Sequence, residues 1–532
     1  MLPANTADAD STGGGVDADP HAETRLAGAR EGMGILLLLL VCLGLTLVIK
    51  PDADNDLWAR LAVGKLTLDK GWVSYHDVFA YTPTKPLWVD HEWGSGVLFY
   101  LTASAFGEAG LLVLKALLLF GTVLFVYLTI RRRTRRSASL WFHVFLAYAL
   151  FFAGFKVTVR CQAFTYFFFA MWLYLLERWR SDRTRGAWWV CPVSMIAWAN
   201  LHGGFLSGLA LLAVFGIGEL LNRRPWKPYV LLAGLCGLVT IANPYGYHYC
   251  TYLLQAATMP RPYITEWQPV NLFGPIRFLL GFRVLFMLAC ALLVVNRIRR
   301  AKTDWVDMLL VGLTGVMALR VIRHTPFFAI SAAPFIYVSF RSAWAAATAG
   351  QGGYTTAVRR FLNRPRVLTL RHGLPHGVLL GATLLAITLS PFRIVMDPSA
   401  FPSGAIDFIQ ANGLRGNLLV PFNWGSYALW RLFPQCRVSM DGRYEGVYED
   451  AVFMEIYRFF EARQGWAETL TRYPPDLILV MHRTPIERKL KKAQGWRVAY
   501  GDELATLFVP AGVSRNWLSP SQRPGTARSV WP

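Results

Sequence analysis

Eleven apolar segments, each close to the length that crosses a lipid bilayer, constrain the fold of this 532-residue chain more than any other feature. A helix needs about 20 apolar residues to span the bilayer. Only 16% of the residues are charged and 54% are hydrophobic, whereas soluble domains carry about 25% charged residues. The sequence therefore predicts an α-helical polytopic membrane protein. The predicted spans are 33–49, 109–130, 138–155, 162–177, 187–201, 204–220, 228–243, 278–295, 304–321, 325–340 and 375–392.

Basic residues fall in short runs between these segments, as in RRRTRR (131–136) and NRIRRAK (296–302), and the net charge is +21. Loops rich in Lys and Arg usually stay in the cytoplasm. We therefore interpret the runs as topology signals, and we do not expect nucleic acid as a partner. The N-terminus and these loops, which hold Arg runs and little else, are predicted to be cytoplasmic. The long loop 50–108 and the polar block 393–532 are then predicted to be extracytoplasmic.

Composition divides the chain into four parts. Residues 1–32, rich in Ala, Asp and Gly, predict a disordered cytoplasmic tail, and residues 33–392 predict the transmembrane domain. In 393–512, short strand-like runs alternate with helix-like runs, which favours a small α/β domain. The strand-like runs are GNLLVPF, RVSMDG, DLILVMH, WRVAYGD and LATLFVP, and the helix-like runs are SGAIDFIQANG, EDAVFMEIYRFFEARQG and TPIERKLKKAQG. Residues 513–532 lack periodicity and predict a flexible tail. The seven cysteines show neither a metal-binding spacing nor a disulfide framework.

Polar residues of mixed chemistry gather at one end of the predicted spans. Such groups are costly in a membrane, so they usually mark function or pair with one another. A lipid or polymer transporter would need a polar track through the spans, where only Lys115 and Arg283 are conspicuous. The pattern favours an enzyme site on the extracytoplasmic face, with a transporter or a non-catalytic membrane scaffold as alternatives. The gathered residues include Asp77, His91, Glu92, Arg160, Gln162, Asn200, His202, Glu266, Arg320, Arg323 and His324.

The loop that follows the first span begins with three acidic residues, Asp52, Asp54 and Asp56. Apolar residues at helical spacing predict a short helix over 57–69, lying in the membrane interface. The pattern leaves two interpretations of Asp56 open, since it can be the N-cap of this helix or a catalytic group. Asp90 is expected to cap a second interfacial helix.

Three more motifs contain polar residues that a site could use. In NLHGGF (200–205), Asn200 and His202 are expected to face outward without a structural role. In RVIRHTPFF (320–328), Arg320 and Arg323 are spaced to share a helix face, where they can bind a phosphate or extend to lipid headgroups. The stretch DGRYE (441–445) predicts an Asp–Gly turn with a local pairing of Arg443 and Glu445, rather than a catalytic group.

The assembled motifs resemble the GT-C superfamily of integral-membrane glycosyltransferases. The resemblance covers roughly 33–510 and includes DLWARLAVG (56–64), DVFAYTPTKPLWVDHEW (77–93), NLHGGF, NPYG (243–246), RVIRHTPFF, WGSY (424–427) and DGRYE. The whole chain is similar to a family of bacterial GT-C-like proteins, which implies a multi-pass protein of the bacterial cytoplasmic membrane. The similarity also implies transfer of a hexosyl or pentosyl group from a polyprenyl-phosphate donor to a cell-envelope glycan or glycoprotein acceptor.

The resemblance also implies roles for single residues. By position Asp56 matches the catalytic carboxylate of the superfamily, with Asp54 forming a DxD-like pair, although the Asp–Glu pair of some members is Asp56–Leu57 here. No cofactor is certain, but a divalent metal such as Mg or Mn is possible because some members bind one through DxD. We expect Asp56 to act as the general base of an inverting transfer. Asp77 and Glu92 are the other expected catalytic residues, and the expected substrate-binding residues are Asp54, His91, Arg160, Gln162, Asn200, His202, Glu266, Arg320, Arg323 and His324.

Overall fold

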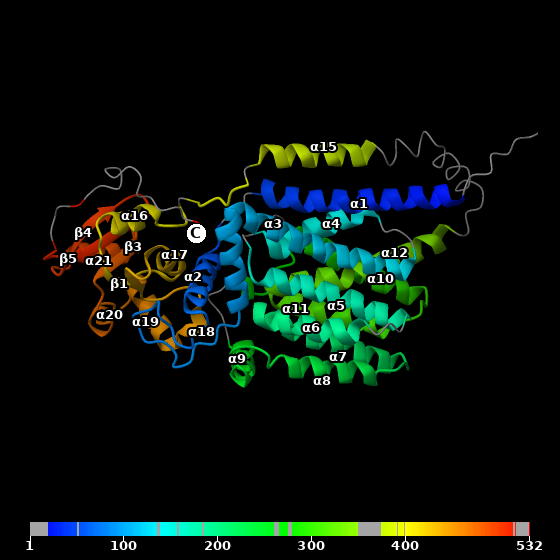
Figure 1. Ribbon diagram of the computed structural model, residues 1–532, viewed down its shortest axis with the longest axis horizontal. Coiled ribbons are helices and arrows are strands. Elements are labelled where there is room, and N and C mark those ends of the chain that lie inside the picture. Colours follow the sequence, from blue (N-terminus) through cyan, green and yellow to red (C-terminus); the bar gives the residue numbers. More distant parts are fainter. Residues whose placement is uncertain are drawn as a thin grey trace, which may run out of the picture.

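The computed structural model describes residues 20–49, 53–135, 139–156, 159–182, 186–259, 265–274, 279–348, 374–390, 392–397 and 399–513, with Trp517 and Trp531. These residues form a bundle of helices and, at one end of the bundle, a smaller domain that contains a β-sheet (Figure 1). Residues 1–19 of the predicted tail and most of the predicted tail 513–532 lie outside the described residues.

Every predicted span coincides with a helix of the bundle. Helix α1 begins earlier than predicted, so that residues 20–32, assigned to a tail, are helical. Helix α9 (Tyr247–Thr258) was not predicted. The bundle helices are α1 (Pro20–Val48), α3 (Trp93–Thr134), α4 (Leu140–Leu150) with the π-helical turn η1 (Phe151–Phe155), α5 (Gln162–Asp182), α6 (Gly186–Leu201), α7 (Leu206–Leu221), α8 (Lys227–Val239), α10 (Leu280–Ile298), α11 (Trp305–Arg320), α12 (Thr325–Thr348) and α15 (Leu374–Leu389).

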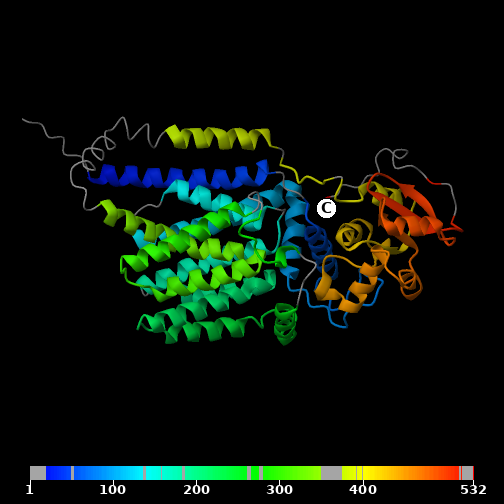
Figure 2. The ribbon, with the colours of Figure 1, turned by 180° about the vertical axis from the view of Figure 1, so that it is seen from behind.

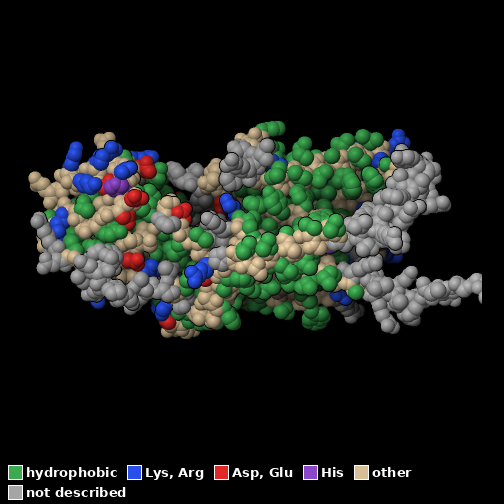
Figure 3. Space-filling model, turned by 90° about the horizontal axis from the view of Figure 1, so that it is seen from above, with side chains coloured by type: hydrophobic (Ala, Val, Ile, Leu, Met, Phe, Trp, Pro, Cys, Tyr) green, Lys and Arg blue, Asp and Glu red, His purple; other side chains and the backbone are tan. Residues whose placement is uncertain are grey.

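Four helical stretches of the described chain are long and apolar enough to cross a membrane, at 31–48, 93–134, 203–221 and 280–298. Shorter apolar helices lie at 140–155, 227–239 and 374–389. Figure 3 shows apolar side chains over the flank of the bundle, while acidic and basic side chains gather on the smaller domain. The polytopic character is thus supported, and the total of eleven spans stays a prediction.

A layer of crossing helices separates the bundle from the smaller domain. It consists of α2 (Asn55–Lys70) and the first part of α3, which turns into the bundle at Gly107 (φ 61°, ψ −158°). Both segments run across the direction of the bundle helices (Figures 1 and 2). Helix α2 was expected to lie on the membrane interface, but Leu57–Gly64 are buried on all sides because α3 and α17 pack against it.

The smaller domain contains a mixed five-stranded sheet in the order β2-β1-β3-β5-β4. Leu418 of β1 pairs in parallel with Val438 of β2 and Leu477 of β3, and Ile478 of β3 pairs in antiparallel with Phe508 of β5. All five strands coincide with predicted strand-like runs. Their bounds are β1 (Gly416–Leu419), β2 (Cys436–Val438), β3 (Leu477–Met481), β4 (Trp496–Gly501) and β5 (Ala505–Pro510).

Helices cover this sheet, and three of them coincide with predicted helical runs: α16, α19 and α21. Helix α17 carries the WGSY motif and was not predicted as a helix. The helices of the domain are α16 (Ser403–Ala411), α17 (Phe422–Leu432), α18 (Tyr444–Val447), α19 (Asp450–Phe460), α20 (Glu468–Arg472) and α21 (Pro485–Lys492).

The loop between α2 and α3 extends the edge of the sheet. Ala80 forms a parallel bridge with Val438 of β2. The Val438 amide donates to the Phe79 carbonyl at 2.9 Å, and the Tyr81 amide donates to the Val438 carbonyl at 3.1 Å. Segments far apart in sequence thereby form one structural unit.

The end of the bundle far from the sheet contains buried ion pairs. Arg133 contacts Glu177 at 2.5 Å and Asp307 at 2.8 Å, and Arg180 contacts Glu219 at 2.7 Å. These carboxylates lie on α5, α7 and α11 and not in the connecting loops, for which Arg runs and little else were expected. Several of these arginines serve helix packing in addition to any topological role.

Candidate functional site

Asp56 lies in the first turn of α2, where this helix meets both the bundle and the C-terminal domain. The N-cap position belongs to Asp54, whose backbone is extended (φ −104°, ψ 144°) and whose side chain makes no capping hydrogen bond. The N-cap interpretation of Asp56 is therefore wrong. A carboxylate in the first turn is nevertheless favoured by the helix dipole. Asp52 lies outside the described residues.

Arg160, directly before α5, gathers the acidic side chains of this region. Two of its nitrogens donate to Asp54, one of them at 3.0 Å, and another donates to Glu266. Its Nε also lies 3.9 Å from Oδ2 of Asp56. The structure thus brings together four residues that the sequence analysis selected from three distant segments. Because carboxylates already occupy this guanidinium, it is less available to a substrate than its expected substrate-binding role requires.

The carboxyl group of Asp56 is poised to exchange a proton near neutral pH. Burial among protein atoms and the charge of Asp54 raise its pKa to about 7, against the opposing charges of Arg160 and Arg323. Of the Asp56 side chain, 44% is still exposed, so an incoming group can reach it. Such a pKa is close to the optimum for a general base at neutral pH.

Glu92 lies at the start of α3 within a second polar cluster. It contacts His202 at 3.4 Å, His91 at 3.6 Å and Arg60 at 3.7 Å. Burial alone would raise the pKa of Glu92, but electrostatic interactions with its two histidine neighbours and with the cations Arg60 and Arg323 lower it to about 2. Glu92 is therefore ionised at neutral pH. The cluster was found only in part from sequence, because Arg60 was not selected.

His202 is fixed by hydrogen bonds in one tautomer. The backbone amide of Gly204 donates to its Nδ1 at 2.9 Å, and the Thr165 hydroxyl lies 2.7 Å from the same atom. Since Trp198 Nε1 donates to the Thr165 oxygen at 2.8 Å, the hydroxyl proton is free to point at Nδ1. Nε2 then carries the proton and faces Glu92. Burial lowers the pKa of His202 to about 3, so the ring is neutral.

The arginines near 320 do not share a helix face, which corrects the prediction. Helix α11 ends at Arg320, and a 3₁₀ turn (Ile322–His324) follows an extended residue. Arg320 is exposed, whereas the guanidinium carbon of Arg323 lies 5.5 Å from the ring centroid of Trp267. The charge of Arg323 acts on both Asp56 and Glu92. Among the described residues Arg323 has no carboxylate partner within 4.0 Å.

The C-terminal domain borders the Asp56 carboxyl directly. A methyl group placed on Gly442 would lie 3.3 Å from Oδ1 of Asp56 and 2.9 Å from Oγ of Ser426. The amide of Gly442 donates to that hydroxyl at 3.0 Å. Trp58, buried on α2, packs edge-on against Tyr427 of α17 with ring centroids 5.4 Å apart. The WGSY and DGRYE motifs therefore meet at Asp56, a contact that their sequence separation concealed.

The Asp77 side chain does not border the accessible space around the Asp56 carboxyl group. Its side chain is 1% exposed and accepts from Arg443 at 2.5 Å, while its other oxygen accepts from the amides of Phe79 and Ala80. Because it has no access to a substrate, we correct its expected catalytic role to a structural one. Asp441 accepts from the Arg443 amide at 3.0 Å, so the predicted turn is present.

Arg443 pairs with Asp441 and Asp77, not with its near neighbour in sequence as predicted. The side chain of Glu445 lies outside the described residues.

Asn200 has a structural role, contrary to expectation. Its amide nitrogen donates to the carbonyls of Ile196 and Ala242 at 2.8 and 2.9 Å, and its oxygen accepts from Trp93 Nε1 at 2.9 Å. It thereby ties the start of α3 to the end of α6.

Gln162 and His324 complete the selected residues. Gln162 is buried at the start of α5, close in sequence to Arg160. The ring of His324 lies 6.3 Å from that of Trp267.

The acidic residues do not fit a magnesium or manganese site. Within the described ranges, no three His, Cys, Asp or Glu side chains are grouped so that they could hold a metal ion. Asp54 and Glu266 are both bound by Arg160, so a guanidinium already neutralises the carboxylates that a DxD site would use. We therefore derive no step that involves a metal.

Comparisons with known proteins place the chain by its fold. No family model matches the sequence, and no curated protein matches it. A solved structure of the oligosaccharyltransferase AglB from Archaeoglobus fulgidus, in complex with an inhibitory peptide and a dolichol-phosphate, matches with a TM-score of 0.58 at 11% identity, over 92% of this chain and 75% of that one. ArnT from Cupriavidus metallidurans, bound to undecaprenyl phosphate, matches with a TM-score of 0.53 at 13% identity, over 92% and 98% of the two chains.

Both matches extend over the bundle and into the C-terminal domain, since they cover 92% of this chain. At 11% and 13% identity, these matches support a shared fold and no shared function. The chain shares the overall fold of these two solved proteins, in agreement with the fold that its resemblance to the GT-C superfamily implied.

Proposed function

We propose that this protein is a membrane glycosyltransferase that moves a sugar from a polyprenyl-phosphate donor to an acceptor hydroxyl on the extracytoplasmic face. The fold supports the reaction class, and two similar structures hold dolichol-phosphate or undecaprenyl phosphate. The observation that carries the proposal is the Asp56 carboxyl group. It is 44% exposed, has a pKa raised to about 7, and lies next to Arg160 within the influence of Arg323.

In the proposed step, Asp56 takes the proton of the acceptor hydroxyl while the acceptor oxygen attacks the anomeric carbon of the sugar. A bond forms between that oxygen and the anomeric carbon, and the bond from the anomeric carbon to the phosphate oxygen breaks. The leaving phosphate keeps the electron pair and needs no proton. Attack from the side opposite to the leaving group inverts the anomeric centre.

Arg323 and Arg320 are the cations we assign to the leaving phosphate. Neither has a carboxylate partner among the described residues, so both retain their donors for a ligand. Stabilising the charge that develops on a leaving group is often the largest catalytic contribution. The ring of Trp267 below the Arg323 guanidinium supports its orientation.

Arg160 and Glu92 have other roles in this proposal. Arg160 holds Asp54 and Glu266 and adjusts the proton affinity of Asp56. Glu92 is ionised at neutral pH, so it is suited to accepting hydrogen bonds from sugar hydroxyls and orienting His202, and not to exchanging protons. His91 and Gln162 remain proposed sugar contacts, and His324 a proposed contact of the donor.

The proposed orientation follows from the basic runs. They lie at the end of the bundle far from the sheet, which we assign to the cytoplasm. The C-terminal domain and the Asp56 site are then extracytoplasmic, in the bacterial cytoplasmic membrane. A cell-envelope glycan or glycoprotein is the acceptor that this location favours.

A transfer assay in membranes tests the proposal. Membranes that contain the protein are incubated with radiolabelled polyprenyl-phosphate hexoses and pentoses, and the release of polyprenyl phosphate and the labelled acceptor are measured. Asp56→Asn keeps the size of the side chain but removes the base, so transfer is expected to fall by about 10²–10⁴-fold.

Asp69→Asn is the matched control, because Asp69 lies at the exposed end of the same helix and pairs with Lys65 on the surface. It is expected to leave transfer unchanged. Normal turnover by a correctly inserted Asp56→Asn protein would refute the assignment of the base.

A further inference from the structure

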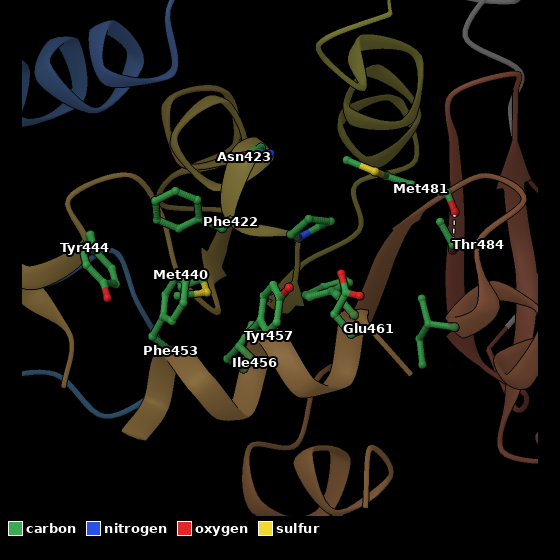
Figure 4. A pocket seen from close by; sticks show the side chains of 13 residues that line it. Phe422, Asn423, Met440, Tyr444, Phe453, Ile456, Tyr457, Glu461, Met481 and Thr484 are labelled. Atoms are coloured by element: carbon green, nitrogen blue, oxygen red, sulfur yellow. Dashed lines mark hydrogen bonds between the residues drawn. The ribbon is translucent and has the colours of Figure 1, made fainter. Parts of the chain in front are cut away.

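A cavity of about 310 Å³ lies within the C-terminal domain, between α17 and α19 and bordered by β3 and α21 (Figure 4). Pockets for small molecules begin at about 300 Å³, so the volume suits a small molecule or one end of a larger one. The proposed transfer reaction does not use this cavity.

Aromatic rings form most of its wall. Phe453 and Tyr457 lie one turn apart on α19 with nearly parallel rings, at an interplanar angle of 9° and 6.2 Å between centroids. Phe422 and Tyr444 pack edge-on against Phe453 with centroids 5.7 and 4.7 Å away. Such a wall accepts apolar groups, and the faces of the rings attract cations.

The charge of the lining is unexpected for a chain with a net charge of +21. The lining contains no Lys, Arg or His, and its single ionisable carboxylate is Glu461. Figure 4 shows the Glu461 carboxylate beside Tyr457, pointing toward the open space of the pocket. Among the described residues, Glu461 has no basic group within 4.0 Å.

Two basic residues that might neutralise Glu461 are engaged elsewhere. The guanidinium carbon of Arg463, two positions away in sequence, lies 5.2 Å from the ring centroid of Tyr457. Lys489 donates to the carbonyl of Ala462 at 2.7 Å and lies 5.7 Å from the centroid of the Trp466 ring. The carboxylate at the rim is therefore available to a ligand.

Tyr444 connects this wall with the loop at Asp56. Its backbone has a φ of 29°, in a region that residues other than glycine rarely adopt, and such strained residues gather at functional sites. The residue two positions earlier, Gly442, lies beside Asp56, since a Cβ placed on it would be 3.3 Å from Oδ1 of Asp56. One short loop thus borders both the cavity and the candidate active site.

We propose that the cavity binds a molecule with an apolar body and a positively charged amine, with the body against the aromatic wall and the ammonium group between Glu461 and the ring faces. An anionic or phosphorylated ligand does not fit, since no basic group lines the cavity. This assignment does not depend on the glycosyltransferase activity.

Binding of three probes of the same shape tests the proposal: 4-phenylbutylamine, 4-phenylbutanol and 4-phenylbutyrate. The full-length protein is placed in phosphatidylcholine nanodiscs, empty nanodiscs serve as the blank, and calorimetry gives the dissociation constants. The amine is expected to bind at least about tenfold more tightly than the butyrate, which corresponds to about 1.4 kcal/mol. Equal affinities, or tighter binding of the butyrate, would overturn the proposal.

Variants locate the site. Glu461→Gln is expected to remove the preference for the amine while the alcohol binds as before, and Ile456→Trp is expected to fill the cavity and abolish binding of all three probes. Met481→Trp narrows the rim at a half-exposed position, so it provides the same test if Ile456→Trp does not fold. Glu503→Gln, on the exposed turn between β4 and β5, is the matched control. A preference that survives Glu461→Gln or is lost in Glu503→Gln would also overturn the assignment.

Discussion

Asp77 and Arg443, 366 positions apart in sequence, form an ion pair at 2.5 Å in which both side chains are only 1% exposed. The guanidinium carbon also lies 4.8 Å from the ring centroids of both Phe79 and Trp88. The pair fastens the loop between α2 and α3 to the C-terminal domain, one residue from Gly442, which lies beside Asp56. The domain thereby becomes part of the wall of the candidate active site.

Breaking this pair is expected to destabilise the junction. Arg443→Met leaves the carboxylates of Asp77 and Asp441 buried without their cation, a change that typically costs about 3–5 kcal/mol. Limited proteolysis of the loop 71–92 and the thermal unfolding midpoint measure the effect. The control is Arg437→Met, at an exposed position of β2. Equal unfolding midpoints for the two variants would contradict an anchoring role.

The pH dependence of transfer is expected to follow Asp56. The base must be ionised, and its pKa is about 7, so the rate should rise with pH through about 7 and then level off. Glu92 and His202 have pKa values lowered to about 2 and 3, so neither titrates in this range. A rate that falls between pH 6 and 8 would contradict the assignment.

Replacing Asp54 or Arg160 should shift the pH–rate profile of transfer in opposite directions. The charge of Asp54 raises the pKa of Asp56 and the charge of Arg160 lowers it. Asp54→Asn is therefore expected to shift the midpoint of the pH–rate profile to lower pH, and Arg160→Gln to higher pH. Shifts in the same direction would show that the variants act through a change in structure and not through charge.

Elements with a strong local pattern were predicted well from the sequence. The apolar segments of the bundle and the five strands of the C-terminal domain appear where periodicity and length placed them. Asp54, Asp56, Arg160 and Glu266 were selected because polar groups at a membrane boundary are costly, and the structure brings them together.

Contacts between segments that are distant in sequence were the features that the sequence analysis predicted least well. Asp77 resembled a catalytic residue because its partner Arg443 lies in another domain, and Asn200 appeared free because its partner Trp93 begins another helix. Arg60 was overlooked although its spacing of four from Asp56 places both on one side of α2. No local pattern shows that α17 covers α2, so the burial of this helix could not be predicted.

Arg323 is expected to act on the donor. Arg323→Ala should weaken binding of the polyprenyl-phosphate sugar more than binding of the acceptor, because no carboxylate of the described residues pairs with this guanidinium. Arg323→Lys should restore part of the affinity by keeping the charge. Separate titrations of donor and acceptor in the transfer assay give the two Michaelis constants. A larger change on the acceptor side would move Arg323 to the acceptor subsite.

Gly64 is expected to be essential for placing Asp56, which lies on the same helix. A methyl group at Gly64 would lie 2.1 Å from the backbone oxygen of Gly96, so Gly64→Ala must push α2 away from α3. Overpacking of this kind costs about 1–3 kcal/mol, and a displacement of about 1 Å at a catalytic group can lower the rate by about 10²-fold. Gly234→Ala is the matched control, because Gly234 lies inside α8 with open space around it. Thermal unfolding and the transfer assay compare the two variants, and a Gly64→Ala protein with the stability and rate of the control would show that α2 does not need this close approach.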